Sequence, residues 1–202
     1  MQPFTKVTGV AAPLLMDDVN TDQISPAERG HGLKPDLKAM LFSRAKKTEP
    51  DFVLNRPQYK ETRILVSREN FGCGSSRENA VWALMANDIT CVIARSIADI
   101  FRENCLRNGV LPIALGEQGA AFEAKVVAVD GAEPFTVDLT TQTITCPDGS
   151  TVKFDISPAE RTALLEGLDD IGMTLKHKAD IEAFEAKLKQ SKPWLQTAAR
   201  QQ

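Results

Sequence analysis

The sequence predicts an α/β protein that combines a central parallel βαβαβ unit with a second, antiparallel layer of strands. Between residues 63 and 115, apolar runs of strand length alternate with segments whose apolar residues recur at helical spacing. After residue 119, short strand-like runs follow one another with turn residues between them, which is typical of antiparallel pairing. Because the 202 residues contain no internal repeat, low-complexity tract or long linker, we expect a single domain over residues 1–202.

The chain begins with a predicted strand that leads into an acidic turn. Lys6–Ala12 has the composition and length of a strand, and Met16–Asp22 follows it with several Asn and Asp side chains that can bond to their own backbone. Asp22 is the candidate functional residue of this turn. From the residues alone, an Asx turn is the simpler interpretation of Asp22.

Residues 25–58 form the least regular stretch of the sequence. Proline and glycine interrupt it repeatedly, and a basic, helix-like patch covers residues 38–47. We interpret the stretch as a long functional loop or lid. Arg29, His31 and Arg44 are candidates for ligand contact, although a solvated basic face is the simpler explanation for each of them taken singly.

The middle of the chain predicts the parallel unit. Three apolar runs have the length of strands, namely Arg63–Ser67, Cys91–Ala94 and Leu111–Leu115. In the segments between them, apolar residues recur at helical spacing. The second of these helices spans Ser96–Asn108 and ends at Gly109. Parallel strands joined in this way bind their ligands at the carboxyl ends of the strands.

The last third of the sequence predicts antiparallel strands and then a helical tail. Ser157-Pro158-Ala159-Glu160 opens a helix with a capping serine, a proline at the first helical position and a glutamate two residues later, and Gly167 closes it. The tail therefore begins at about residue 157, and a final amphipathic helix spans about Lys178–Lys189. The predicted strands are Lys125–Val129, Phe135–Leu139, Gln142–Cys146 and Thr151–Phe154.

The run Asn70–Asn79, between the first strand and the first helix of the parallel unit, predicts an anion-binding turn. Gly72 and Gly74 leave room for an anion to approach, and the free N–H groups at the start of the following helix would favour it. Arg77 adds a planar fork of donors that suits a carboxylate. A capping box with Ser75 at the N-cap and Glu78 three residues later is the alternative, and it would explain only these two residues.

The same run excludes two common nucleotide sites. A dinucleotide-binding fingerprint needs a third glycine where Arg77 stands, and a Walker loop needs a Gly-Lys-Ser/Thr sequence that is absent. The predicted ligand is therefore a small organic acid.

The composition limits which partners the chain can have and where it can be located. A formal net charge of −3 and a pI near 5.5 provide no basic footprint for nucleic acid, and no apolar run approaches the length of a membrane span. We therefore expect a cytoplasmic protein without nucleic-acid or membrane partners. The four cysteines are irregularly spaced and lack a Cys-x-x-Cys pair, which favours free thiols over disulfides.

Several segments, in their order along the chain, resemble the isopropylmalate dehydratase small subunits of the aconitase superfamily. The Asn70–Glu78 run with Trp82-Ala83-Leu84 resembles the family signature, and the likeness extends from about Phe4 to Trp194. The other similar segments are Asn20–Ile24, Asp51–Asn55, Ser96–Phe101, Asn104-Cys105, Asn108–Ile113 and Gly167–Ile171. The resemblance implies a three-layer β/β/α swivelling domain.

The resemblance also implies roles for particular residues. Ser75 would be the base that abstracts a proton, and Arg77 would bind a substrate carboxylate. Ser76 would add a hydrogen bond to the substrate, and Gly74 would line its binding site. Asp22 would be a second catalytic residue, in a turn that approaches the catalytic serine.

The implied reaction interconverts 2-isopropylmalate and 3-isopropylmalate by dehydration and rehydration, in leucine biosynthesis. It needs a Lewis acid, and the two histidines and four cysteines of this chain have no ligand spacing, so we expect no metal or cofactor site here. The resemblance places a [4Fe-4S] cluster in a large subunit that would form a heterodimer with this chain. The loop at 25–58 would then recognise the isopropyl group through apolar residues, namely Leu33, Leu37, Met40, Leu41 and Phe42.

The sequence departs from the family pattern at two positions. Asn79 replaces a histidine, and Ser25 replaces an apolar residue. Two alternatives therefore stay open: a related hydro-lyase that acts on citraconate, dimethylmalate or homoaconitate, and a non-catalytic carboxylate-binding domain that would not need Ser75.

Overall fold

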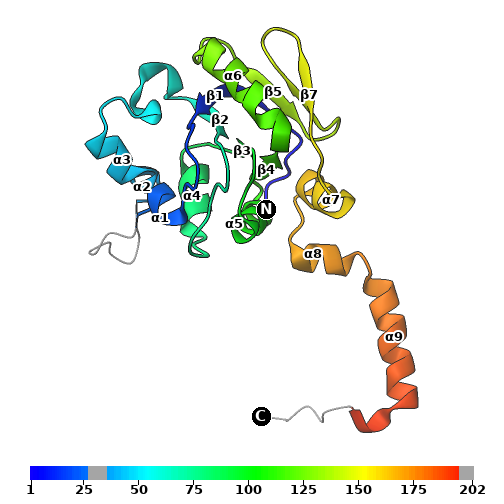
Figure 1. Ribbon diagram of the computed structural model, residues 1–202. Coiled ribbons are helices and arrows are strands. Elements are labelled where there is room, and N and C mark those ends of the chain that lie inside the picture. Colours follow the sequence, from blue (N-terminus) through cyan, green and yellow to red (C-terminus); the bar gives the residue numbers. More distant parts are fainter. Residues whose placement is uncertain (27–35, 196–202) are drawn as a thin grey trace. The chain divides into compact units, whose positions relative to one another are not determined.

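The computed structural model describes residues 1–26 and 36–195 (Figure 1). The chain forms two compact units, of which the first is Met1–Gly167 and the second is Leu168–Gln202. The expectation of a single domain stays a prediction.

The elements of the first unit follow the expected order closely. Its strands are β1 (Lys6–Pro13), β2 (Thr62–Val66), β3 (Cys91–Ala94), β4 (Leu111–Ala114), β5 (Phe135–Asp138), β6 (Thr143–Thr145) and β7 (Thr151–Lys153). Its α-helices are α1 (Thr21–Ile24), α2 (Leu37–Met40), α3 (Ser43–Thr48), α4 (Asn79–Ala86), α5 (Asp99–Asn108), α6 (Gly119–Val129) and α7 (Pro158–Glu166). Short 3-10 helices are η1 (Val53–Asn55), η2 (Pro57–Tyr59) and η3 (Gly116–Gln118).

The strands form one seven-stranded mixed sheet in the order β4-β3-β2-β1-β5-β6-β7. The pairs β1–β2, β2–β3 and β3–β4 are parallel, and β2-α4-β3-α5-β4 is the predicted βαβαβ unit. The pairs β1–β5, β5–β6 and β6–β7 are antiparallel. The predicted fold class is therefore confirmed, and β1 joins its parallel and antiparallel parts.

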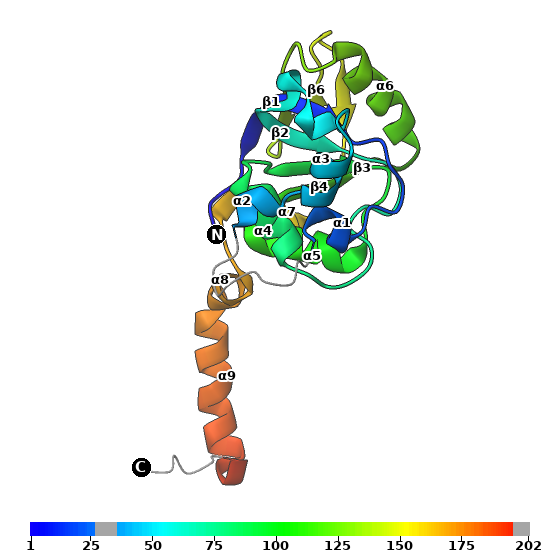
Figure 2. The same ribbon diagram turned by 90° about the vertical axis from the view of Figure 1, so that its left-hand side faces the viewer.

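Two hydrophobic cores separate the layers of the first unit. Along β2 the side chains alternate, so that Ile64 and Val66 enter one core and Leu65 enters the other. The core that contains Ile64 also contains Val137 of β5 and Ile144 of β6, so it lies between the parallel and the antiparallel strands. The core that contains Leu65 is closed by α4 and α5, which lie on the side of the parallel strands away from α6 (Figures 1 and 2).

The expected strand at Lys125–Val129 is wrong, because these residues end helix α6. The β-branched valines of this run favoured a strand, but the helix begins at Gly119, and its buried residues Phe122 and Val126 lie four positions apart on one helical face. The run Lys125–Val129 was too short to distinguish the residue period of a strand from that of a helix. The helix period becomes visible only when the window is extended back to residue 119.

The expected long loop at 25–58 is also partly wrong. Residues 27–35 of the stretch lie outside the described structure. Its part from residue 36 onward contains α2, α3, η1 and the start of η2. Met40, Leu41 and Phe42 are buried, which explains why the stretch is helical and packed rather than extended over the surface. Leu33 and the candidates Arg29 and His31 lie outside the described residues.

The helical tail is confirmed in its main elements. Ser157 caps α7 in a capping box with Glu160, and Gly167 ends this helix with a left-handed conformation (φ 68°). The second unit contains α8 (Asp170–Leu175), α9 (Lys178–Ser191) and η4 (Pro193–Leu195). The final amphipathic helix was expected at about 178–189, which matches α9.

Candidate active site

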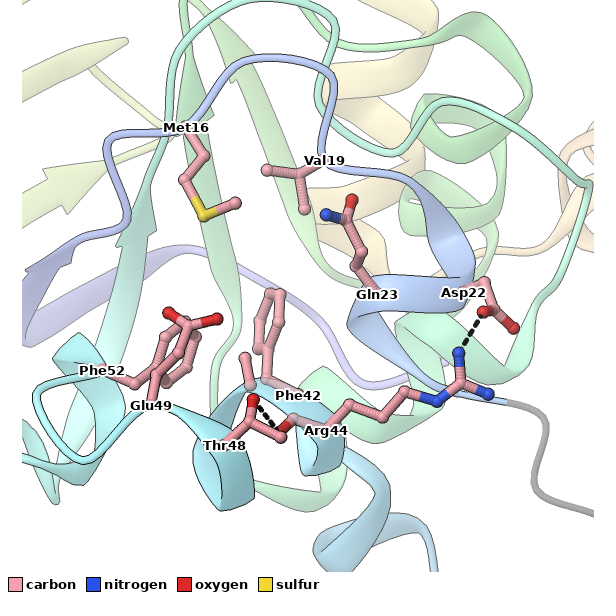
Figure 3. Close-up of a pocket in the computed structure, with 10 residues that line it drawn as sticks. Met16, Val19, Asp22, Gln23, Phe42, Arg44, Thr48, Glu49 and Phe52 are labelled. Atoms are coloured by element: carbon pink, nitrogen blue, oxygen red, sulfur yellow. Dashed lines mark hydrogen bonds and ion pairs between the residues drawn. The ribbon is translucent and has the colours of Figure 1, made fainter.

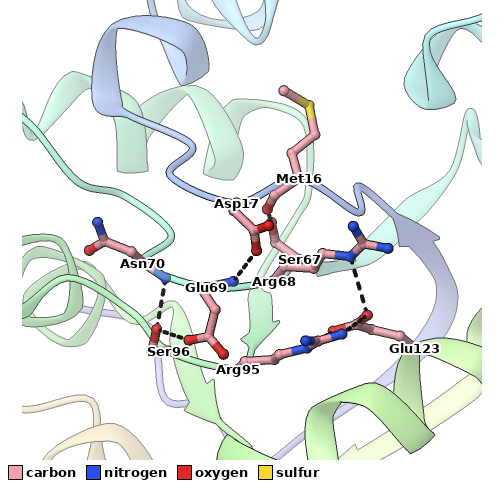
Figure 4. Close-up of polar contacts among 9 residues, drawn as sticks. All are labelled: Met16, Asp17, Ser67, Arg68, Glu69, Asn70, Arg95, Ser96 and Glu123. Carbon is pink, nitrogen blue, oxygen red and sulfur yellow. Dashed lines mark hydrogen bonds and ion pairs between the residues drawn. The ribbon is translucent and has the colours of Figure 1, made fainter.

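The candidate site lies in the segment that follows the carboxyl end of β2. A polar network ties the start of this segment to the segments that follow β1 and β3 (Figure 4). The Glu69 N–H donates to Asp17 Oδ1 (3.1 Å), the Asn70 N–H donates to Ser96 Oγ (2.7 Å), and Ser96 Oγ donates to Glu69 Oε2 (2.6 Å). These hydrogen bonds therefore fix the start of the segment to the carboxyl ends of β1 and β3.

A buried carboxylate also helps to hold these strand ends together. Glu123 of α6 is 5% exposed and accepts two hydrogen bonds from Arg95, from Nε at 2.7 Å and from Nη2 at 2.8 Å (Figure 4). Arg68, next to Glu69 in the chain, lies 3.5 Å from the same carboxylate. Because Glu123 is paired with Arg95 and Arg68, its burial links α6 to the ends of β2 and β3.

Phe71 and Gly72 anchor the middle of the segment. The Phe71 ring is buried and packs edge-on against Phe101, with ring centroids 5.4 Å apart. Gly72 has a φ of +80°, and a Cβ added there would lie 2.2 Å from Phe101 Cγ. The interpretation of Gly72 as a gap for an anion is therefore wrong, because Phe101 occupies that space.

We predict that Gly72→Ala destabilises the chain by at least about 3 kcal/mol, because it adds both a steric clash and left-handed strain. Gly149→Ala is the matched control, since Gly149 has the same φ of +80° with nothing within 4 Å of the added Cβ. We expect the control to lose only about 1–2 kcal/mol. Urea unfolding followed by circular dichroism measures both, and equal losses would contradict the steric argument.

Helix α1 brings Asp22 to this segment. Asn20 and Cys73 form a parallel bridge, and the Thr21 N–H donates to the Cys73 carbonyl (2.9 Å). The Thr21 hydroxyl donates to the Ser75 carbonyl (2.8 Å). The caps of α1 are Asn20 and Gln23, not Asp22, so the Asx-turn interpretation of Asp22 is wrong.

The Asp22 carboxylate lies between two arginines. One of its oxygens accepts a hydrogen bond from Arg77 Nη1, and the other accepts one from Arg44 Nη1 at 2.8 Å (Figure 3). Arg77 and Arg44 are partly exposed, at 37% and 57% of their side chains. Among these three groups one positive charge is left over, which favours the approach of an anion.

Ser75 is not a helix cap. Helix α4 begins at Asn79, its N-cap is Glu78, and no side chain caps it. The Ser75 carbonyl accepts hydrogen bonds from the Thr21 hydroxyl and the Arg77 N–H (2.7 Å), which holds residues 75–77 outside the helix. The Glu78 carboxylate instead accepts a hydrogen bond from the Asn108 side chain at 2.8 Å. The predicted capping box is therefore absent from α4.

The environment of Ser75 suits a reacting group better than a structural one. Its side chain is exposed, and its hydroxyl bonds to nothing in the described part of the chain. The N–H groups of Gly74, Ser75 and Ser76 likewise donate to no acceptor among the described residues. A left-handed φ of +89° at Gly74 shapes this turn, and a Cβ there would lie 3.4 Å from Asn20 Cβ. These N–H groups of the turn are therefore available to bind an anion.

The cysteines are free thiols, as expected. Cys73, the one nearest the site, directs its Sγ to the Asp18 carbonyl at 3.3 Å, and burial, together with Asp18, raises the pKa of this thiol. Cys91, Cys105 and Cys146 are buried. Within residues 1–26 and 36–195 no three His, Cys, Asp or Glu side chains gather as a metal site would require. None of the helices in this part of the chain is long and apolar enough to span a membrane.

A pocket of about 180 Å³ opens beside Asp22 and Arg44 (Figure 3). Of the apolar residues expected to recognise a ligand, Phe42 is the only one within the described residues that lines it. Sequence reasoning missed Met16, Val19 and Phe52 as lining residues. Met16 and Val19 belong to the acidic turn Met16–Asp22, which is the one signal that could have pointed to them.

Three family models match successive parts of the chain. The aconitase C-terminal domain matches residues 1–118, LeuD_N matches residues 124–158, and the C-terminal domain of the 3-isopropylmalate dehydratase small subunit matches residues 170–198. The first of these covers the β1–β4 sheet and the whole candidate site.

Relatives extend the match over nearly the whole chain. The 3-isopropylmalate dehydratase small subunit of Dinoroseobacter shibae is 46% identical, over 96% of this chain and 100% of the relative. That of Rhodospirillum centenum is 48% identical, over 96% of this chain and 98% of the relative. A crystal structure of 3-isopropylmalate dehydratase from Methanocaldococcus jannaschii is 27% identical and superposes with a TM-score of 0.60, covering 89% of this chain and 99% of that one. The chain therefore belongs to the family of 3-isopropylmalate dehydratase small subunits.

Proposed function

We infer that this chain is the small subunit of a 3-isopropylmalate dehydratase, a hydro-lyase of leucine biosynthesis that acts with a large subunit. The observation that supports a catalytic role for the chain is the Ser75 hydroxyl, exposed and unbonded among the described residues, in the same turn as the Asp22–Arg77 pair. A non-catalytic carboxylate-binding domain would need the arginine but not this serine. The proposed enzyme, like its leucine pathway, belongs in the cytoplasm.

We propose that Arg77 binds a substrate carboxylate and that Asp22 orients Arg77. The guanidinium is already held through one of its nitrogens by Asp22, which fixes its plane and leaves other donors for the ligand. A carboxylate bound in this way places the neighbouring C–H bond near the turn that carries Ser75. Gly74 leaves this approach open, and Ser76, which is also exposed, would add a hydrogen bond to the substrate.

Ser75 is the proposed base. The C–H bond next to the carboxylate breaks, its proton goes to Ser75 Oγ, and its electron pair forms a carbon–carbon double bond while the hydroxyl of the neighbouring carbon leaves as hydroxide. Addition of water to the double bond in the opposite sense gives the isomer. A serine needs a stabilised alkoxide for this step, and the free N–H groups of residues 74–76, with Arg77 nearby, are the groups that would stabilise it.

The Lewis acid for the departing hydroxide must come from the partner. The cysteines described above do not fit an iron–sulfur cluster, because Cys73 is directed to a backbone carbonyl and the other three are buried apart from the site. We propose that the [4Fe-4S] cluster is held by the large subunit, where it supplies a Lewis acid to the substrate hydroxyl. The active site is then completed by a heterodimer.

The substrate decides between this function and that of a related hydro-lyase. The chain is combined with the large subunit from the same organism, and kcat/KM is compared for isopropylmalate, citraconate, dimethylmalate and homoaconitate. We expect the highest value for isopropylmalate, and no activity from the small subunit alone. A higher value for one of the other substrates would reassign the enzyme, and turnover by the isolated, metal-stripped chain would refute the need for a partner.

A further inference from the structure

Thr21 holds two carbonyl groups of the turn that carries Ser75. Its N–H donates to the Cys73 carbonyl at 2.9 Å, and its hydroxyl donates to the Ser75 carbonyl at 2.8 Å. Thr21 is 2% exposed, so water has little access to its donor groups. A Cβ added to Gly74, which lies between Cys73 and Ser75, would lie 3.8 Å from Thr21 Oγ1. The buried threonine therefore lies directly against the turn.

These two carbonyls fix the direction of two N–H groups. The Cys73 carbonyl shares a peptide plane with the Gly74 N–H, the Ser75 carbonyl shares one with the Ser76 N–H, and both peptides are trans. In a trans peptide the C=O and N–H groups point in opposite directions. Because both carbonyls point toward Thr21, the two N–H groups point away from it, and neither donates to an acceptor in the described part of the chain. Two free donors thus flank Ser75 along the chain and share a direction.

The Thr21 hydroxyl ties the turn to a separate element. The Ser75 carbonyl also accepts a hydrogen bond from the Arg77 N–H at 2.7 Å, but Arg77 belongs to the same turn and moves with it. Thr21 instead belongs to α1, which the reciprocal capping box of Asn20 and Gln23 holds in place. Loss of the hydroxyl would leave the Ser75 carbonyl with one hydrogen-bond partner, while the peptide plane that carries the Ser76 N–H would be free to rotate.

We propose that Thr21 is a positioning residue for the reaction, which turns the N–H groups of Gly74 and Ser76 outward so that they stabilise the charged, proton-accepting form of Ser75. Donors that are held in place before the reaction need no reorganisation when charge forms, which is what makes them effective. Thr21 acts through the peptide planes of the turn and not by contact with the substrate. The inference rests on the proposed function, because that function makes Ser75 the base.

The test removes the Thr21 hydroxyl and keeps the shape of the side chain. Thr21→Val makes this change, whereas Thr21→Ser keeps the hydroxyl and removes the methyl group. Thr62→Val is the matched control, because Thr62 is 4% exposed and its hydroxyl donates to the Tyr59 carbonyl at 2.6 Å, at the opposite end of β2 from the site. Each variant is assembled with the large subunit, kcat and KM are measured for isopropylmalate, and urea unfolding of each chain measures its stability.

We expect Thr21→Val to lower kcat about 10- to 100-fold with little change in KM, since complete removal of such a donor costs about 10²–10³-fold and here the donor is misdirected. Thr21→Ser should recover most of kcat. Thr62→Val should lose a comparable amount of stability and keep kcat, because it loses the same kind of hydrogen bond away from the site.

Three results would overturn the proposal: equal kcat values for Thr21→Val and Thr62→Val, a rise in KM without a fall in kcat, or no recovery of kcat in Thr21→Ser. Near-normal turnover by a Ser75→Ala complex would instead overturn the proposed role of Ser75 as the base. Loss of turnover in Ser75→Ala with normal kcat in Thr21→Val would leave that role intact and remove only the role of Thr21.

Discussion

Ser75→Ala in the reconstituted complex is expected to lower kcat by about 10²–10⁴-fold, the range associated with loss of a general acid–base group. The change removes one oxygen that bonds to nothing in the described part of the chain, so the free energy of unfolding should stay the same. KM should change little, because the carboxylate contacts remain. Steady-state kinetics and urea unfolding of the variant measure these three quantities.

The neighbouring hydroxyl serves as the comparison. Ser76→Ala removes the same group from the next exposed position, and it should mainly raise KM if Ser76 only hydrogen-bonds to the substrate. Near-normal turnover by Ser75→Ala would remove Ser75 from the mechanism and would favour a carboxylate-binding role for the turn.

Arg77→Lys is the second large effect that we expect. Lysine keeps the charge but loses the planar fork, so the variant cannot bind Asp22 and a substrate carboxylate with the same geometry. A hydrogen bond to a charged group contributes about 1.5–3 kcal/mol, which corresponds to an increase in KM of roughly 10- to 150-fold. The fold decrease in kcat should be smaller than the fold increase in KM. Steady-state kinetics of the reconstituted complex measures both constants, as for Ser75→Ala.

Arg107→Lys is the matched control for this substitution. Arg107 pairs with Glu103 on the surface of α5, with both side chains more than half exposed, so its replacement should leave KM unchanged. An unchanged KM in Arg77→Lys as well would show that the guanidinium does not contact the substrate. A loss of stability together with an unchanged KM would assign the arginine to the Asp22 pair alone.

The parallel unit could be predicted from the sequence because its signals are local and redundant. The strands β2, β3 and β4 are short apolar runs, and the helices between them carry buried residues at helical spacing, as in Ala80, Val81, Ala83 and Leu84 of α4. Gly109 and the Ser157–Glu160 cap marked helix ends correctly because these residues satisfy the helix termini themselves.

The errors arose where tertiary contacts outweigh local preference. The valines of α6 favour a strand locally, but Phe122 and Val126 pack as a helical face. The residues from Ser75 to Glu78 have the pattern of a capping box, but the contact of Thr21 with the Ser75 carbonyl draws them away from the helix. The Thr21–Ser75 contact joins residues 54 positions apart, and no local pattern encodes it.

The candidate site was predictable in its residue types but not in its connections. Ser75, Arg77 and Asp22 were recognised through their resemblance to a family, and the structure brings Asp22 and Arg77 into contact. The second partner of Asp22, Arg44, was explained from the sequence as part of a solvated face. Only the packing of α3 beside α1 shows that it shares the Asp22 carboxylate and borders the pocket.

The central claim is that this chain supplies the base of a shared active site, and the most direct measurement follows the proton itself. Isopropylmalate labelled with deuterium at the carbon that loses its proton is incubated with the complex in ordinary water, and the label is followed by NMR. We predict that the complex removes the label from this carbon and that the Ser75→Ala complex binds the substrate but keeps the label there. Loss of the label from this carbon in the Ser75→Ala complex at the rate of the unaltered complex would contradict the claim, because the proton would then be taken by a group other than Ser75.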